Sequence, residues 1–315
     1  NEGDEVITTP ITFAASANCI LYQGGTPVFA DIDKKTYNID QEDIRKKITG
    51  NTKAIIPVHY TGQPCDMDKI KEIAKEKDLI VIEDGAHAIG ATYKDQKIGS
   101  IGDMTTFSFH PVKNMTTGEG GMITTDSQEL YDKLIKFRTH GITKNDSDYI
   151  NPSHGFWYHE QQELGYNYRI TDIQAALGIS QLEKLDKYLE RRREIVKEYN
   201  KAFIDFEGII IPDQLENTNS VWHLYVIQLH LEILTAGRKE IFKDLRNKNL
   251  GVNVHYIPVY YHPYYQELGY EKGICPNAER LYERIITIPL YPKMSDQQVE
   301  EVINRTKEVI RKYQK

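Results

Sequence analysis

The first 125 residues alternate between short apolar runs and stretches with helical spacing. Runs rich in β-branched residues, each of strand length, occur at 3–9, 26–33, 53–60, 78–84, 105–110 and 121–125. The clearest helix is predicted over 66–78, where Met67, Ile70 and Ile73 share one face. Strands that alternate with helices over such short distances predict βαβ units and a mostly parallel sheet. The run at 78–84 is apolar almost throughout, so we expect a strand buried on both faces.

The middle of the chain is first polar and then strongly helical. A polar stretch runs from His140 to Gln162, and its length predicts a functional or mobile loop. From 171 to 203 the apolar spacing predicts one long helix, which Thr171 can cap. Gly178 is the one position inside this helix that favours a break.

The last third of the chain alternates again on a smaller scale. Strands are predicted at 221–231 and 252–261, and helices at 237–251 and 295–315. We therefore predict an α/β fold with a large domain over 1–204 and a smaller C-terminal α/β domain over 205–315.

Composition narrows the classes of function. The 315 residues include 39 Lys+Arg and 46 Asp+Glu, which gives a net charge of −7 with histidine neutral. With no basic run, the chain is not expected to bind nucleic acid or an anionic membrane surface. No apolar stretch approaches the roughly 18 residues that a spanning helix needs. Cys19, Cys65 and Cys275 lie far apart and form no CxxC pair, so we predict no disulfide framework and a reduced, cytoplasmic setting.

Reactive side chains follow two of the predicted strands. Asp84 closes the run at 78–84, and His87 comes three residues later. The run at 105–110 leads into a segment with further candidates and then a glycine-rich stretch; the candidates are Ser108, His110 and Lys113. In an open α/β sheet, ligands bind at the carboxyl ends of the strands. We therefore expect these groups to share one site.

Lys113 has two readings from its context. Most lysines are solvated surface charges. Lys113, however, lies just beyond an apolar strand and before Gly118, Gly120 and Gly121, where the backbone can approach a ligand closely. A partly desolvated lysine has a lowered pKa and becomes an amine nucleophile toward carbonyls. Spacing alone leaves both readings open.

Asp84 has three readings. It could bind a nucleotide ribose, but no G-x-G-x-x-G element precedes it. It could cap a following helix. It could also pair with the pyridinium nitrogen of a cofactor and so strengthen that ring as an electron sink. The presence of Lys113 favours this third reading. His87 and His110 have no second His or Cys at metal-ligand spacing, so no metal site is predicted.

Five segments, spread over the whole chain, are specific in combination. They are SFHPVKNMTTGEGG, VIEDGAHAIGATY, TTPITFAASAN, ELGYNYRITDIQAALGISQLEKLD and ITIPLYP. Together they resemble the DegT/StrS-type nucleotide-sugar aminotransferases, which use pyridoxal 5'-phosphate (PLP) on the fold-type I scaffold. That scaffold is a mostly parallel mixed sheet flanked by helices, with a smaller C-terminal α/β domain. The Tyr-rich VNVHYIPVYYHPYYQELGY is most similar to the UDP-4-amino-4,6-dideoxy-N-acetyl-beta-L-altrosamine transaminases of pseudaminic acid synthesis.

The resemblance implies a role for each matching residue. Lys113 would be the Schiff-base lysine and proton shuttle, and Asp84 would pair with the pyridine nitrogen. The other cofactor-binding residues would be His87 beside the ring, Phe13 stacked on it, Ser108 at the phosphate, and Asn167 reaching the phosphate from a neighbouring subunit. His255 and Tyr256 would bind the sugar or the amino donor. For Phe13, His255 and Tyr256, packing in the core is an equally good reading.

The implied reaction moves an amino group from L-glutamate to C4 of a UDP-linked 4-keto-6-deoxy amino sugar, in a homodimer with shared active sites. The related UDP-4-keto-arabinose aminotransferases are close rivals. Three further functions compete with amine transfer: a non-catalytic regulator that binds PLP or nucleotide sugars, a PLP-dependent sugar dehydratase and a Rossmann oxidoreductase. The family also carries a segment before Gly3 whose helix N-terminus binds the phosphate. We therefore expect this chain to be a fragment that holds PLP poorly by itself.

Overall fold

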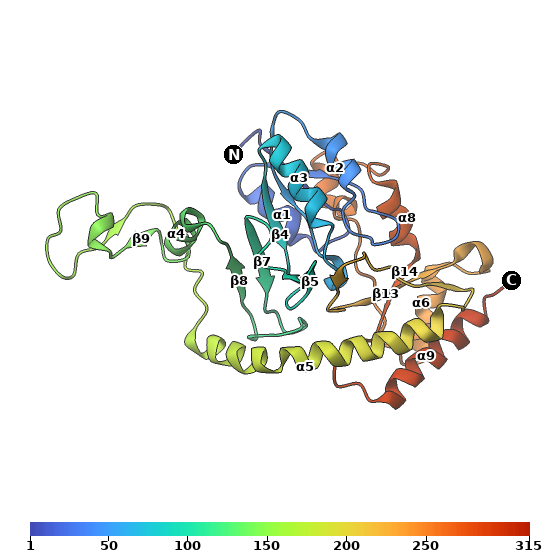
Figure 1. Cartoon of the computed structure of the whole chain (residues 1–315). Helices are drawn as coiled ribbons and strands as arrows, with labels where there is room; N and C mark the ends of the chain where they lie inside the picture. Colours follow the sequence, from blue (N-terminus) through green and yellow to red (C-terminus); the bar gives the residue numbers. More distant parts are fainter.

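Six strands form the main sheet of the structure, a computed structural model that describes residues 1–315 (Figure 1). They are β1 (Glu5–Thr8), β2 (Thr26–Phe29), β3 (Thr52–Ile56), β4 (Ile80–Asp84), β7 (Met104–Ser108) and β8 (Gly121–Thr124). The order across the sheet is β2-β1-β3-β4-β7-β8. All neighbours are parallel except β7 and β8, which are antiparallel. The prediction of a mostly parallel sheet is therefore confirmed.

Four helices accompany this sheet. They are α1 (Ala15–Tyr22), α2 (Gln41–Lys47), α3 (Met67–Lys77) and α4 (Gln128–Phe137). In α3 the predicted apolar face, Met67, Ile70 and Ile73, is fully buried in the same core as Val81 of β4. Ile80 at the start of β4 is 45% exposed, so the prediction that this strand is buried on both faces is wrong. Side chains point to alternate faces along the strand, and only Val81 and Glu83 are fully buried.

Helix α5 (Asp172–Phe203) runs without interruption from the large sheet to the far end of the molecule (Figure 1). Thr171 and Gln174 form a capping box at its start, as the sequence predicts for Thr171. The expected break at Gly178 is absent. A Cβ at this position would lie 3.0 Å from Thr117 Cγ2, so glycine allows the helix to approach the loop that carries Lys113.

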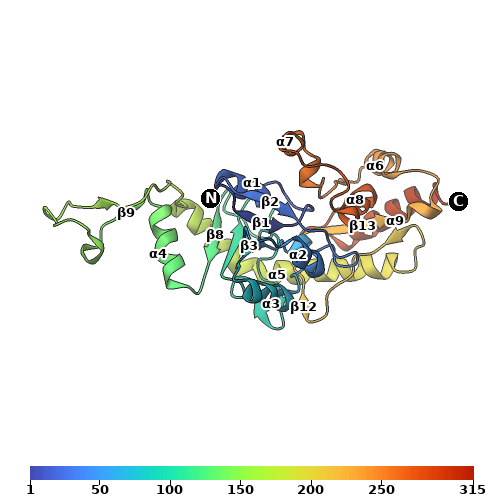
Figure 2. The ribbon, with the colours of Figure 1, turned by 90° about the horizontal axis from the view of Figure 1, so that it is seen from above.

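The polar stretch at 140–162 is not a simple loop, because it forms a projecting hairpin between α4 and α5 (Figures 1 and 2). Its strands are β9 (Ile142–Thr143) and β10 (Glu160–Gln161). The Glu160 carboxylate accepts hydrogen bonds from the Ile150 and Asn151 amides, both at 2.7 Å, and from the Tyr158 hydroxyl. These donors, the Ile150 amide first, lower the pKa of Glu160 to about 2. We call the segment 138–171 the arm.

The smaller C-terminal sheet is antiparallel, in the order β11-β13-β14. Its strands are β11 (Ile209–Ile210), β13 (Tyr225–Leu229) and β14 (Ile285–Ile288). Its helices are α6 (Arg238–Asn247), α7 (Pro263–Glu267), α8 (Pro276–Arg284) and α9 (Asp296–Arg311). Three short strands form a separate sheet that is not hydrogen-bonded to the other two. They are β5 (Thr92–Tyr93), β6 (Gln96–Lys97) and β12 (Thr218–Asn219). Together, the large mixed sheet and this smaller sheet confirm the predicted α/β fold class.

The strand predicted at 252–261 is wrong. The segment has one isolated bridge, between Asn253 and Thr287, and then a helical turn at Val259–Tyr261. Pairing ends at Asn253, and Pro258, which lacks an amide hydrogen for a strand ladder, directly precedes the helical turn. The third strand of the small sheet is instead β14, which the sequence did not reveal.

Two large cores and one aromatic cluster hold the chain together. The small-sheet core includes Ile195, Tyr199 and Phe203 of α5, so the second half of that helix packs with the C-terminal elements. The aromatic cluster joins Phe29 of β2 to Tyr260 and to other residues of the C-terminal region. The division at 204/205 stays a prediction. None of the helices has both the length and the apolar character that crossing a membrane requires.

Candidate active site

A cavity of about 480 Å³ lies where β4 and β7 end. Eight of the residues singled out in the sequence line it: Phe13, Asp84, His87, Ser108, His110, Lys113, His255 and Tyr256. Asp84 and Ser108 are the last residues of two adjacent parallel strands, so their side chains reach the same edge of the sheet. The reactive groups therefore gather at this edge as expected. The volume of the cavity is typical of a small-molecule site.

Asp84 is held in one orientation by two donors. The Ser16 hydroxyl donates to Oδ2 at 2.6 Å, and the Ala86 amide donates to Oδ1 at 3.0 Å. Thr12 Oγ1 lies 2.7 Å from Ser16 Oγ and extends this chain of hydroxyls. A turn and not a helix follows β4, so the reading of Asp84 as a helix cap is wrong. The carboxylate is left to face the cavity.

Lys113 is half-buried and shares the cavity with Asp84. Burial lowers the pKa of its amine, and the negative charge of Asp84 raises the pKa only in part. Its amide donates to His110 O at 2.9 Å, which closes a tight turn at the start of the loop. This environment does not fit a solvated surface lysine. Compared with a solvent-exposed position, the half-buried environment of Lys113 favours the neutral form of its amine.

His87, Tyr256 and Phe13 form an aromatic side of the cavity. The Tyr256 hydroxyl lies 3.1 Å from His87 Nε2, and burial raises the pKa of Tyr256. Burial lowers the pKa of His87 well below its ordinary value, and Lys113 lowers it further. Phe13 is 66% exposed, with its ring centroid 6.4 Å from that of Tyr256. The core-packing reading of Phe13 is therefore wrong.

His255 connects the cavity to the small sheet. Its Nδ1 lies 2.9 Å from the Thr287 hydroxyl of β14. Burial lowers the pKa of His255 to about 4, and the Lys113 charge contributes. The side chain is therefore neutral near pH 7.

This lowered pKa predicts a loss of stability in mild acid. Between about pH 6.5 and pH 4 the unfolded chain binds a proton at His255 that the folded chain does not, so stability rises with pH across this window. We expect the free energy of unfolding to fall by roughly 3 kcal/mol from this residue as pH decreases through it. Denaturant titrations from pH 7 to pH 4 should show a shallower fall in His255→Gln, whereas His154→Gln, an exposed arm residue, should match the wild type. Equal slopes in all three proteins would contradict this.

Asn167 is not part of the cavity. It lies on the exposed arm, where its backbone pairs with Thr139 in an isolated bridge. Within one chain it meets none of the other predicted residues, so its proposed reach into a second subunit stays a prediction.

Sequence reasoning missed three residues near the cavity: Ser16, Asn114 and His223. Ser16 lies in the ITFAASAN segment, three residues after Phe13, and Asn114 directly follows Lys113. A search for polar residues next to those already chosen could have found these two. His223 contacts Asn114 from 109 positions away, and no local signal points to it.

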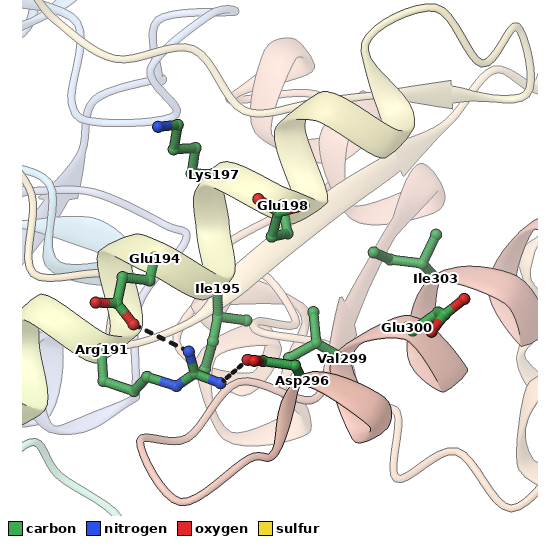
Figure 3. A pocket seen from close by; sticks show the side chains of 9 residues that line it. All are labelled: Arg191, Glu194, Ile195, Lys197, Glu198, Asp296, Val299, Glu300 and Ile303. Carbon is green, nitrogen blue, oxygen red and sulfur yellow. Dashed lines mark hydrogen bonds and ion pairs between the residues drawn. The ribbon is translucent and has the colours of Figure 1, made fainter.

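A larger hollow, of about 660 Å³, lies between α5 and α9 (Figure 3). Three of its charged side chains bond to one another. The Arg191 guanidinium donates to Glu194 at 2.9 Å and to Asp296 at 2.6 Å. None of the predicted site residues lines this hollow, and it holds no nucleophile beside a polarising group. No group of three or more His, Cys, Asp or Glu side chains is arranged to hold a metal ion.

The chain matches the model of the DegT/DnrJ/EryC1/StrS aminotransferase family over residues 1–307. It belongs to this family and is a sugar aminotransferase. It is 51% identical over 308 residues to the uncharacterized protein MJ1066 of Methanocaldococcus jannaschii, covering 98% of this chain and 80% of that protein. It is 40% identical to the GDP-perosamine synthase of Escherichia coli O157:H7, covering 95% of this chain and 77% of that protein. It is 39% identical to the UDP-4-amino-4,6-dideoxy-N-acetyl-beta-L-altrosamine transaminase of Campylobacter jejuni, covering 92% and 75%.

Solved structures agree with this assignment. The PLP-form of the putative sugar aminotransferase Spr1654 from Streptococcus pneumoniae has a TM-score of 0.90 at 34% identity, covering 99% of this chain and 82% of that one. PseC of Helicobacter pylori, an aminotransferase involved in the biosynthesis of pseudoaminic acid, has a TM-score of 0.92 at 32% identity, covering 99% and 81%. The fold is thus that of the PLP-dependent aminotransferases, and the cofactor is PLP.

The residues of the cavity fit PLP. Asp84 presents a carboxylate fixed by two donors, as a pyridinium nitrogen requires, and Lys113 presents a half-buried amine. His87 Nδ1 is a buried nitrogen without a hydrogen-bond partner, and it belongs to a ring that lines the same cavity. An acid, an amine and an unpaired imidazole nitrogen around one cavity are suited to a ring that carries an aldehyde and polar substituents.

Proposed function

We propose that this enzyme transfers the amino group of L-glutamate to C4 of a UDP-linked 4-keto-6-deoxy amino sugar, the aminotransfer step of pseudaminic acid synthesis. The observation that carries the amine-transfer chemistry is the pairing of Lys113 and Asp84 across one cavity. The Tyr-rich segment at 252–270 and the likeness to PseC support the choice of sugar. We further propose that the enzyme works in the cytoplasm.

The identity values favour a second candidate almost equally. Identity to the GDP-perosamine synthase is 40%, against 39% for the UDP-sugar transaminase. A GDP-linked keto sugar is therefore the alternative substrate, with UDP-4-keto-arabinose as the third. Because amine transfer at a keto carbon is common to all three, the cavity chemistry does not distinguish the nucleotide.

In this proposal, the cavity residues divide the work of holding PLP. When bound, PLP supplies an aldehyde that captures amines and a ring that accepts an electron pair. Lys113 Nζ would bond to that aldehyde in the resting enzyme, and Asp84 would keep a proton on the ring nitrogen. Phe13 would cover one ring face, Ser108 would donate to the phosphate and His87 would contact the ring edge.

Lys113 also moves the proton in the reaction. With the amino donor bound, Lys113 Nζ would be a free amine whose pKa is lowered by burial, so it would accept the proton from the donor Cα. In the second half of the cycle the same nitrogen would give a proton to C4 of the acceptor sugar. Tyr256 and His255 stay neutral near pH 7 and bind polar groups of the substrates without adding charge.

Product analysis tests the proposal. The PLP-loaded protein is incubated with L-glutamate and each of the three keto sugars, the UDP-linked amino sugar, the GDP-linked sugar and UDP-4-keto-arabinose. Formation of 2-oxoglutarate and an amino sugar of the expected mass from the first sugar supports the proposal. Product from only one of the others reassigns the substrate. Stable binding of PLP and nucleotide sugar without any product would instead support a regulator.

We also propose that the active unit is a homodimer. Large apolar side chains lie exposed on β8, the arm and the first half of α5: Met122, Ile123, Trp157, Leu164, Tyr168 and Ile173. Large apolar side chains left exposed on three elements are typical of an interface and not of a free monomer. Asn167 lies between Leu164 and Tyr168 in the chain and is exposed, which supports its proposed contact with the cofactor of a second subunit.

Sedimentation of the PLP-loaded protein should therefore show a dimer. Ile173→Asp introduces a charge at a side chain that is 85% exposed in the single chain, and we expect it to weaken the dimer and to lower activity in parallel. Ile204→Asp, at the other end of α5 and 65% exposed, is the matched control and should leave both unchanged. A fully active monomer would refute the shared active site.

A further inference from the structure

A second buried imidazole, that of His223, lies against His87 and has no role in the proposed reaction. The two ring centroids are 4.3 Å apart, and each side chain is 6% exposed. Burial lowers the pKa of both rings well below the ordinary value for histidine, so both are neutral at pH 7. His223 precedes β13 and thus belongs to the C-terminal part of the chain.

His223 contacts the residue next to Lys113. Its Nδ1 donates to Asn114 Oδ1 at 3.3 Å, because a carbonyl oxygen can only accept. Asn114 is 7% exposed, and its amide nitrogen has no hydrogen-bond partner. His87 Nδ1 is likewise unpaired. A contact that served packing alone would be made more favourably by apolar side chains, since unpaired buried polar atoms destabilise a fold.

The backbone of His223 is held from two sides. Its amide donates to Thr61 O at 2.7 Å, and Arg192 Nη1 donates to its carbonyl oxygen at 3.2 Å. Gly62 has a φ of +97°, and a Cβ there would lie 2.9 Å from His87 O and 3.2 Å from the His223 amide. Only glycine allows this turn to approach both histidines. The His223 ring therefore projects from a fixed point.

We propose that His223 is a positioning residue for Lys113, acting through Asn114. The hydrogen bond fixes the side chain of Asn114 and with it the peptide that follows Lys113, while the contact between the imidazoles fixes His87 beside Tyr256. The small-sheet region thereby sets the direction from which the Lys113 amine approaches its substrate. This inference rests on the proposed function, in which Lys113 is the reacting amine.

Three variants test the pairing: His223→Leu, Asn114→Leu and the double variant. The first readout is the rate of the L-glutamate half-reaction in a single turnover, which needs no sugar. We expect His223→Leu to lower this rate roughly 10- to 100-fold through misplacement of the amine. The KM for glutamate should change by less than about threefold, because the contact does not touch the substrate. His223→Asn, which keeps a donor near Nδ1, should recover part of the rate.

The second readout is the pH titration of the visible absorbance band of PLP joined to Lys113, which needs no amino donor. We expect its midpoint to shift by about one unit in His223→Leu, since the surroundings of the amine change. The double variant should be no worse than the poorer single variant, because both remove one contact. His230→Gln, an exposed histidine at the other end of β13, is the control and should match the wild type.

Each outcome decides the inference. Wild-type rates and midpoints in both leucine variants would overturn it, as would additive losses in the double variant. A lower rate that disappears when it is expressed per folded, PLP-bound site would show a purely structural contact and would also overturn it. Failure of the wild type with every keto sugar would refute the proposed substrate only, since both readouts are made without sugar.

Discussion

Lys113→Ala is expected to abolish amine transfer and the visible absorbance band of PLP joined to the protein. The variant removes the only amine that lines the cavity, so no other side chain there can form the covalent link or move the proton from the donor Cα. We expect kcat to fall by at least ~10⁴-fold, which corresponds to roughly 5 kcal/mol of transition-state stabilisation. Steady-state assays and absorbance spectra of the PLP-loaded protein measure the two losses.

Lys97→Ala is the matched control for this prediction. Lys97 lies on β6 and is exposed, so its removal should leave both activity and spectrum unchanged. If Lys113→Ala keeps either the absorbance band or turnover, Lys113 is not the Schiff-base lysine.

Asp84→Asn is expected to be the second most damaging change. The amide has nearly the shape of the carboxylate: its oxygen can accept from the Ala86 amide and its NH2 group can donate to the Ser16 hydroxyl, so the fold should persist. It carries no charge, however, and cannot keep the ring nitrogen of PLP protonated. We expect kcat for the glutamate half-reaction to fall by roughly 10²- to 10³-fold, the usual effect of losing one electrostatic partner at a reacting centre.

Asp78→Asn offers a control just before the same strand. Asp78 ends α3 in the left-handed conformation, which asparagine also adopts readily, and it lies before β4 at the end opposite Asp84. Stopped-flow traces for Asp78→Asn should overlay those of the wild type. A half-reaction in Asp84→Asn as fast as in this control would exclude Asp84 as the partner of the ring nitrogen.

Much of the site was predictable because the sheet is parallel. Once 78–84 and 105–110 are recognised as strands, the rule that ligands bind at carboxyl ends brings Asp84 and Lys113 to one edge. The long helix at 171–203 was equally predictable, since its spacing and its cap agree. These are local signals, and they can be recognised in the sequence without any knowledge of the rest of the fold.

The errors of prediction arise where contacts between distant segments determine the local structure. The strand expected at 252–261 pairs at Asn253 only, and the pairing of β13 with the short β14 depends on neighbours that the pattern does not encode. Gly178 looks like a helix breaker until the approach of Thr117 is known. His223 could not be found at all, because its importance comes from a residue 109 positions away.

The continuity of α5 has a mechanical consequence. Its 32 residues span roughly 48 Å, with the arm at one end and the core of the small sheet at the other. An unbroken helix of this length behaves as a stiff rod. A displacement of the small-sheet core would therefore be carried along the helix to the base of the arm, and in the proposed dimer onward to the second subunit.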